Sequence, residues 1–126
     1  MSDQFDLPDH DRRRELLKSL VYSCCSLTNG VETILEHAEL TDSNDGGMGS
    51  FSLQYAGRGS SEQVAATAKY IDADGISANI SLYTDSSGSP TEIEIWKTNF
   101  EQIVEFPISN RLFNIECKTK NCKRSD

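Results

Sequence analysis

The chain has 126 residues and a formal net charge of −8 at pH 7, which suits one domain that buries roughly two-thirds of its unfolded surface. Its apolar runs fall far short of the roughly 20 residues that a membrane-spanning helix needs. Residues 1–11 are acidic where a secretory signal would be basic and then apolar. The composition therefore argues against a membrane protein and predicts a cytoplasmic location.

Charge is unevenly distributed along the chain. Residues 118–126 carry four basic side chains and one acidic one, which leaves 8 basic and 19 acidic residues, a charge of −11, on residues 1–116. An acidic body repels nucleic acid and anionic lipid and attracts basic partners, although solubility alone also explains such a charge. We expect one α+β domain over residues 1–117, followed by a disordered basic tail over 118–126.

The cysteines and histidines give little support to a metal site or an active site. Cys24 and Cys25 are adjacent within a helical pattern, so only Cys117 and Cys122 are free to approach each other, and a disulfide framework is not expected. A zinc site would have to recruit distant ligands. Because the chain has only two histidines, neither in a convincing site, we predict no catalytic residue, no metal and no cofactor.

The firmest predicted element is a helix over residues 9–28. Its apolar positions fall on one stripe at helical spacing: Leu16, Leu17, Leu20, Val21, Cys24 and Leu27. Pro8, Asp9 and Asp11 suit its first turn, and Asn29-Gly30 suits its end. Residues 31–40 are compatible with either a strand or a helical turn, and the glycine-rich residues 41–50 predict a turn or loop.

The remainder of the chain shows the alternation of β-strands. Residues 51–56 predict one strand, residues 64–71 and 76–83 a hairpin around the turn 72–75, and residues 91–98 a further strand after the turn 85–90. Residues 99–104 are compatible with one helical turn. Residues 111–117 predict a last strand, with Phe113 and Ile115 facing inward.

This order predicts an α+β fold in which the helix packs on an antiparallel meander of about five or six strands. One sheet face is expected to meet the helix and the other to be more polar. The polar set consists of Ser77, Asn79, Ser81, Tyr83, Glu92, Glu94 and Trp96. Its mixture of aromatic rings, small polar groups and carboxylates is typical of a partner-binding surface, although Trp96 is equally compatible with the core.

Two motifs resemble known ligand loops only in part. Residues 45–50 (DGGMGS) lack the Gly-Lys-Ser/Thr ending of a phosphate-binding loop, so their glycines are better explained by backbone turns. Residues 72–75 (DADG) begin like a calcium loop, but Tyr83 stands where the glutamate at the twelfth position would be. We interpret this second motif as a turn.

Two further stretches carry a family resemblance: DGGMGSF at residues 45–51, and residues 80–88 together with EIEIWKTNF at 92–100. Over roughly residues 31–107 the chain resembles a family of small uncharacterised bacterial domains with a Gly-Gly-Met-Gly-Ser loop before a strand and an Ile-Trp-Lys-Thr-Asp-Phe-like signature. Asn99 stands where that signature has an acidic residue, so we assign no role to that carboxylate.

In build, such acidic domains are similar to immunity proteins of contact-dependent growth inhibition toxin systems. The resemblance implies that the chain neutralises a cognate toxin domain in the cytosol, a basic nuclease being the expected class, through carboxylates that pair with Lys and Arg. The residues expected to bind the partner are Asp72, Asp74, Tyr83, Asp85, Glu92, Glu94, Trp96, Glu101 and Glu105, with Trp96 or Tyr83 as the energetic hot spot.

Two alternatives remain open at this point. One is a housekeeping interaction domain or homodimer that pairs through the strand edges at Phe51 or Arg111. The other is a small-molecule-binding domain that uses the glycine-rich loop.

Overall fold

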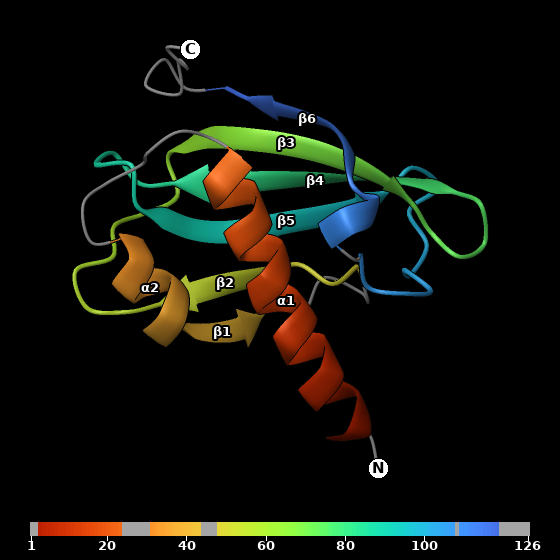
Figure 1. Cartoon of the computed structure of the whole chain (residues 1–126), viewed down its shortest axis with the longest axis horizontal. Helices are drawn as coiled ribbons and strands as arrows, with labels where there is room; N and C mark the ends of the chain where they lie inside the picture. The colour runs from red at the N-terminus through yellow and green to blue at the C-terminus, as the bar shows by residue number, and fades with distance from the viewer. Residues whose placement is uncertain (1–2, 24–30, 44–47, 108, 119–126) are drawn as a thin grey trace.

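A computed structural model describes residues 3–23, 31–43, 48–107 and 109–118. They form a helix, α1 (Asp3–Ser23), a short helix α2 (Val31–His37), the strands β1 (Glu39–Asp42), β2 (Phe51–Gln54), β3 (Gln63–Ile71), β4 (Ser77–Thr84) and β5 (Pro90–Lys97), a 3₁₀ turn η1 (Ser109–Arg111) and the strand β6 (Phe113–Cys117). The predicted α+β fold is confirmed, with α1 lying across one face of the sheet (Figure 1).

The sheet has six strands in the order β1-β2-β5-β4-β3-β6, and the paired strands are antiparallel. Only β3, β4 and β5 follow one another as a meander, so the prediction of a meander through the whole sheet is wrong. Because β2 lies between β1 and β5, the Phe51 strand is not an edge. The edges of this sheet are β1 and β6 (Figure 1).

The core lies between α1 and the covered face of the sheet. The apolar stripe of α1 is buried there, with Leu16, Leu17 and Leu20 fully enclosed against Ile80, Ile93 and their neighbours. This arrangement follows from the sequence, because a helical stripe and a strand with period-two alternation each have one apolar face to bury. A bulge between Val64 and Ala66 shifts the register of β3, so Ala65 and Ala66 are both buried.

Several boundaries differ from the predictions. Helix α1 begins at Asp3 instead of residue 9, with Pro8 in its second turn, where the fixed backbone φ of proline is still helical. The predicted helix end at Asn29-Gly30 and the tail after Lys118 lie outside the described residues. The ambiguous stretch 31–40 holds both a helix, α2, and the start of a strand, β1.

The last part of the chain contains two wrong predictions. Residues 99–104 form no helical turn, and the short helical element, η1, comes only after Pro107. Phe113 and Ile115 do not face the core, because β6 is an edge strand with a register shift opposite β3; their exposed fractions are 41% and 39%. Leu112 and Cys117 contact the core instead.

Candidate functional site

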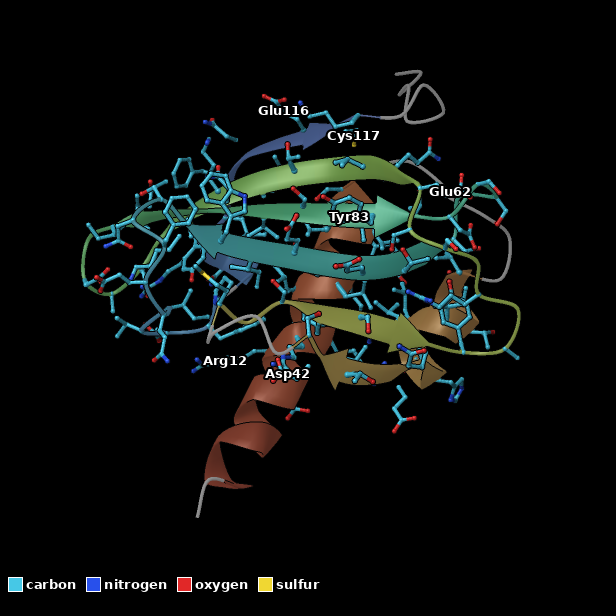
Figure 2. All side chains as sticks on the ribbon, turned by 180° about the vertical axis from the view of Figure 1, so that it is seen from behind. Arg12, Asp42, Glu62, Tyr83, Glu116 and Cys117 are labelled. Carbon is cyan, nitrogen blue, oxygen red and sulfur yellow. The ribbon has the colours of Figure 1, made fainter. Side chains whose placement is uncertain are left out.

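The sheet face opposite α1 carries the polar set expected from the alternation of β4 and β5. We call this surface the open face, defined by Ser77, Asn79, Ser81, Tyr83, Glu92, Glu94 and Trp96. The inward neighbours of these residues are buried, whereas the set itself is half-buried or exposed. Figure 2 shows this face from behind, with Tyr83 near its middle and α1 beyond the sheet.

Glu92 and Glu94 are the carboxylates of the open face. They stand two residues apart on β5, so their Cα atoms are about 7 Å apart on one face. The Ser61 hydroxyl donates to Oε1 of Glu92 at 3.1 Å, and the Tyr83 hydroxyl donates to Oε1 of Glu94 at 2.9 Å. Both donors are neutral, and within the described chain neither carboxylate has an ion pair. Their negative charge is therefore held in place without being neutralised.

Tyr83 lies directly across from Glu92 in the β4–β5 register. Burial of its ring raises the pKa of the Tyr83 hydroxyl, and the hydrogen bond to Glu94 raises it further. The hydroxyl thus remains a proton donor to Glu94 well above neutral pH.

Trp96 also belongs to the open face and not to the core. Its exposed fraction is 37%, and its ring is stacked on that of Phe100, with centroids 5.9 Å apart and an interplanar angle of 13°. Phe100, the last residue of the stretch 92–100, was not among the residues expected to bind a partner; it is 74% exposed and has a backbone φ of 62°. Its exposure and its stacking on Trp96 are revealed only by the fold, because the chain has left the alternating pattern of β5 when it reaches Phe100.

A groove of about 330 Å³ lies beside Trp96, across the open face toward β6. Thr67, Asn79 and Ser81 contribute polar side chains to it, and Lys69 donates to Oδ1 of Asn79 at 2.7 Å. Glu116 and Lys118, which form an ion pair at 2.7 Å, line its far side. Unlike the strip that carries Glu92 and Glu94, this region has mixed charge.

Asp72 and Asp74, unlike Glu92 and Glu94, already form ion pairs within the chain. The buried Lys97 Nζ lies 2.9 Å from Oδ2 of Asp72 and 2.6 Å from Oδ2 of Asp74. Asp72 also accepts the backbone N–H groups of Val104 at 2.7 Å and Glu105 at 3.0 Å. Burial opposes ionisation of Asp72, but these N–H donors and Lys97 outweigh it, so the pKa of Asp72 is lowered. We therefore assign Asp72 and Asp74 to stability and leave them out of the binding surface.

Asp85 has a similar structural role in the turn between β4 and β5. Its Oδ1 accepts the backbone N–H groups of Ser87 and Ser89, each at 3.0 Å, and its Oδ2 accepts that of Gly59 at 3.0 Å. Burial opposes ionisation here too, yet the hydrogen bonds prevail and lower the pKa of Asp85. A carboxylate that is 95% buried and engaged at both oxygens has little left to offer a partner, so Asp85 is left out as well.

The remaining predicted carboxylates are separate from the strip of Glu92 and Glu94. Glu101 follows the end of β5 and is exposed, and its backbone N–H is capped by Oδ1 of Asn99 at 3.1 Å. Glu105 lies 3.9 Å from Nη1 of Arg12, a residue of α1, and thus points toward the helix. The structure brings together Tyr83, Glu92, Glu94 and Trp96 on the open face. Of the other five predicted residues, Asp72 and Asp74 meet at Lys97, next to the backbone of Glu105, whereas Asp85 and Glu101 lie in separate turns.

The glycine-rich stretch at residues 45–51 and the stretch 92–100 meet in the fold where the structure describes them. In the glycine-rich loop, the Ser50 hydroxyl accepts the N–H of Ile95 at 2.8 Å and lies 3.1 Å from its carbonyl oxygen, and Met48 Sδ accepts the N–H of Lys97 at 3.4 Å. A Cβ on Gly49 would lie 2.8 Å from Cδ1 of Ile103. The described part of this loop thus anchors β5, and residues 44–47 lie outside the description.

Cys117 is disulfide-bonded, although no disulfide framework was expected from the cysteine spacing. Its Sγ lies 3.5 Å from the carbonyl oxygen of Ser23, which places it at the end of α1. Within the described residues, no group of three or more His, Cys, Asp or Glu side chains could hold a metal ion. The helices described include none that is both long and apolar enough to cross a bilayer.

Comparison with protein families gives a match over residues 9–107 to a model described as "Domain of unknown function (DUF6984)". Comparisons with curated proteins and with solved structures found no match. The matched range includes α1 from residue 9 onward, the stretches 45–51 and 92–100, the strands β1 to β5 and the loop that carries Phe100. The chain therefore belongs to the DUF6984 family of domains of unknown function.

Proposed function

We propose that this chain is a non-catalytic binding domain that takes a basic protein partner onto its open face, and that the partner is a toxin domain neutralised in the cytosol of the producing cell. One observation carries the proposal: Glu92 and Glu94 are half-buried, fixed by neutral hydroxyl donors and without a counter-ion among the described residues. A partner that supplies Lys or Arg completes these carboxylates with charge-assisted hydrogen bonds.

The overall charge supports a basic partner. The charge of −11 on residues 1–116 attracts a cationic protein from a distance, and steered association of this kind reaches rate constants of about 10⁸ M⁻¹s⁻¹ at low salt. A nuclease is the expected class because it binds nucleic acid through Lys and Arg side chains, and Glu92 and Glu94 can form ion pairs with the same side chains. Trp96 next to this strip adds the apolar contact that interface hot spots use.

The proposal is tested by co-purification of the tagged chain with the product of the gene immediately upstream of its own. We expect a tight one-to-one complex, and we expect co-expression to rescue cells from that product. The Glu92→Gln/Glu94→Gln double variant should weaken both binding and rescue, whereas Glu15→Gln on α1, an exposed carboxylate on the opposite side of the sheet, should change neither. No complex and no rescue with the wild-type chain would refute the proposed function for that pair.

A further inference from the structure

Phe100 combines two unfavourable features. Its side chain is 74% exposed to solvent, and its backbone φ of 62° lies in the left-handed region, which is a genuine outlier for a bulky residue. Neither feature helps the isolated chain, because an exposed ring gains little from burial and a left-handed backbone costs free energy. Strain of this kind persists only where the surroundings enforce it, and such positions cluster at functional sites.

The surroundings of Phe100 do enforce it. Its N–H donates to the carbonyl oxygen of Lys97 at 2.8 Å, which closes a tight turn at the end of β5. The Lys97 ammonium group donates to the carbonyl oxygen of Gln102 at 3.1 Å, two residues beyond Phe100. Asp72 then holds the next stretch through the N–H groups of Val104 and Glu105. The buried Lys97–Asp72 pair thus fixes both sides of the turn that presents the ring.

The ring is presented on the open face. It stacks on Trp96, which shares that face with Glu94 two residues earlier on β5. Since most of Phe100 is exposed to solvent, the stacked pair leaves apolar ring surface that the described residues do not cover. It needs a concave surface on a macromolecule, and the uncompensated carboxylates beside it require that surface to be basic at its rim.

We propose that Phe100 and Trp96 form an aromatic knob that inserts into an apolar pocket of the basic protein partner, while Glu92 and Glu94 pair with Lys or Arg side chains at the rim of that pocket. This inference rests on the proposed function and deepens it. It adds Phe100 as the central contact and specifies the shape of the partner as an apolar pocket with a cationic rim.

The first arm of the test needs no partner. Phe100→Gly removes the ring and relieves the left-handed backbone, so its melting temperature should stay within about 3 °C of the wild type. Asn114→Gly is the matched backbone control, since Asn114 also has a positive φ, 52°, on the exposed strand β6. A fall of more than about 6 °C for Phe100→Gly alone would make Phe100 a structural residue and would overturn the inference.

The second arm measures affinity for the product of the upstream gene, with the full-length chain. Phe100→Gly should weaken binding by about 10- to 100-fold, as expected for a hot-spot side chain. Tyr22→Ala is the control for loss of an exposed ring, because Tyr22 is 60% exposed on α1, on the other side of the sheet, and it should weaken binding by less than about threefold.

A spectroscopic readout locates the contact independently of affinity. Trp96 is the only tryptophan of the chain, so 5-fluorotryptophan incorporated there gives a single ¹⁹F resonance. Addition of the unlabelled partner should shift this resonance and reduce its solvent isotope effect. If the wild-type complex forms, but Phe100→Gly does not weaken it and the resonance does not shift, the aromatic knob is refuted and the proposed function is not. If the wild-type chain forms no complex, both are refuted.

Discussion

The ammonium group of Lys97 lies 2.9 Å from Oδ2 of Asp72, and both side chains are inaccessible to solvent. Asp72 belongs to the turn between β3 and β4, whereas Lys97 is the last residue of β5. The pair therefore joins the β3–β4 turn to the end of β5, and its remaining hydrogen bonds fix the loop over residues 102–105. Lys97 is thus a structural anchor, although it is the direct neighbour of the exposed Trp96.

Replacement of Asp72 should be far more damaging than replacement of Asp74. Asp72→Asn keeps the volume of the side chain but replaces one carboxylate oxygen, which accepts hydrogen bonds, with an N–H₂ group that faces other donors. Breaking a buried ion pair in this way costs about 3 kcal/mol in the free energy of unfolding. Asp74 is 40% exposed, so water can solvate Lys97 in its place and Asp74→Asn should have a smaller effect. Urea denaturation of both variants checks this order, and equal losses would contradict the role assigned to Asp72.

Stability should fall in acid because of Asp72 and Asp85. Both have folded-state pKa values below the ordinary 3.8, so their stabilising contribution is complete above the pKa of the unfolded chain and is lost as pH falls through the folded pKa. We expect a melting temperature that is nearly constant from about pH 7 to 5 and decreases below about pH 4. Asp85→Asn should melt lower at pH 7 and show a shallower acid decrease. A decrease as steep as that of the wild type would refute this role for Asp85.

Alanine substitution at two glycines of positive φ separates the cost of backbone strain alone from the cost of backbone strain together with a steric clash. Gly49 and Gly57 both have positive φ, 91° and 84°, but a Cβ on Gly49 would lie 2.8 Å from Ile103 whereas one on Gly57 would meet nothing within 4 Å. Gly57→Ala should therefore cost only the backbone penalty, about 1 kcal/mol, and Gly49→Ala about 2–3 kcal/mol. Chemical denaturation measures both, and equal costs would show that Ile103 moves aside freely.

The electrostatic part of the proposed function predicts a rate effect. Glu92→Gln and Glu94→Gln should each lower the association rate constant with the basic partner and reduce its dependence on salt, because long-range attraction acts before contact is made. Stopped-flow mixing at several ionic strengths measures this, with Glu15→Gln on α1 as the charge-matched control. An association rate that is insensitive to salt in the wild type would remove the electrostatic basis for these two residues.

Much of the open face could be predicted from the sequence. Side chains of a strand point alternately to its two faces whatever its neighbours are, so Tyr83, Glu92, Glu94 and Trp96 had to share one face once β4 and β5 formed a hairpin. The stripe of α1 followed equally from helical period, because the apolar side chains of one stripe must be buried together. Both results follow from local periodicity alone and do not depend on contacts between distant segments.

The tertiary structure alone decided which carboxylates are free. Asp72 and Glu92 have the same charge in the sequence, yet the loop over residues 102–105 and Lys97 enclose the first, and only hydroxyl groups hold the second. The place of β2 beside β5, the outward direction of Phe113 on an edge strand and the strained exposure of Phe100 depend likewise on contacts between distant segments. Such contacts are set by the packing of the whole chain, and no short-range pattern encodes them.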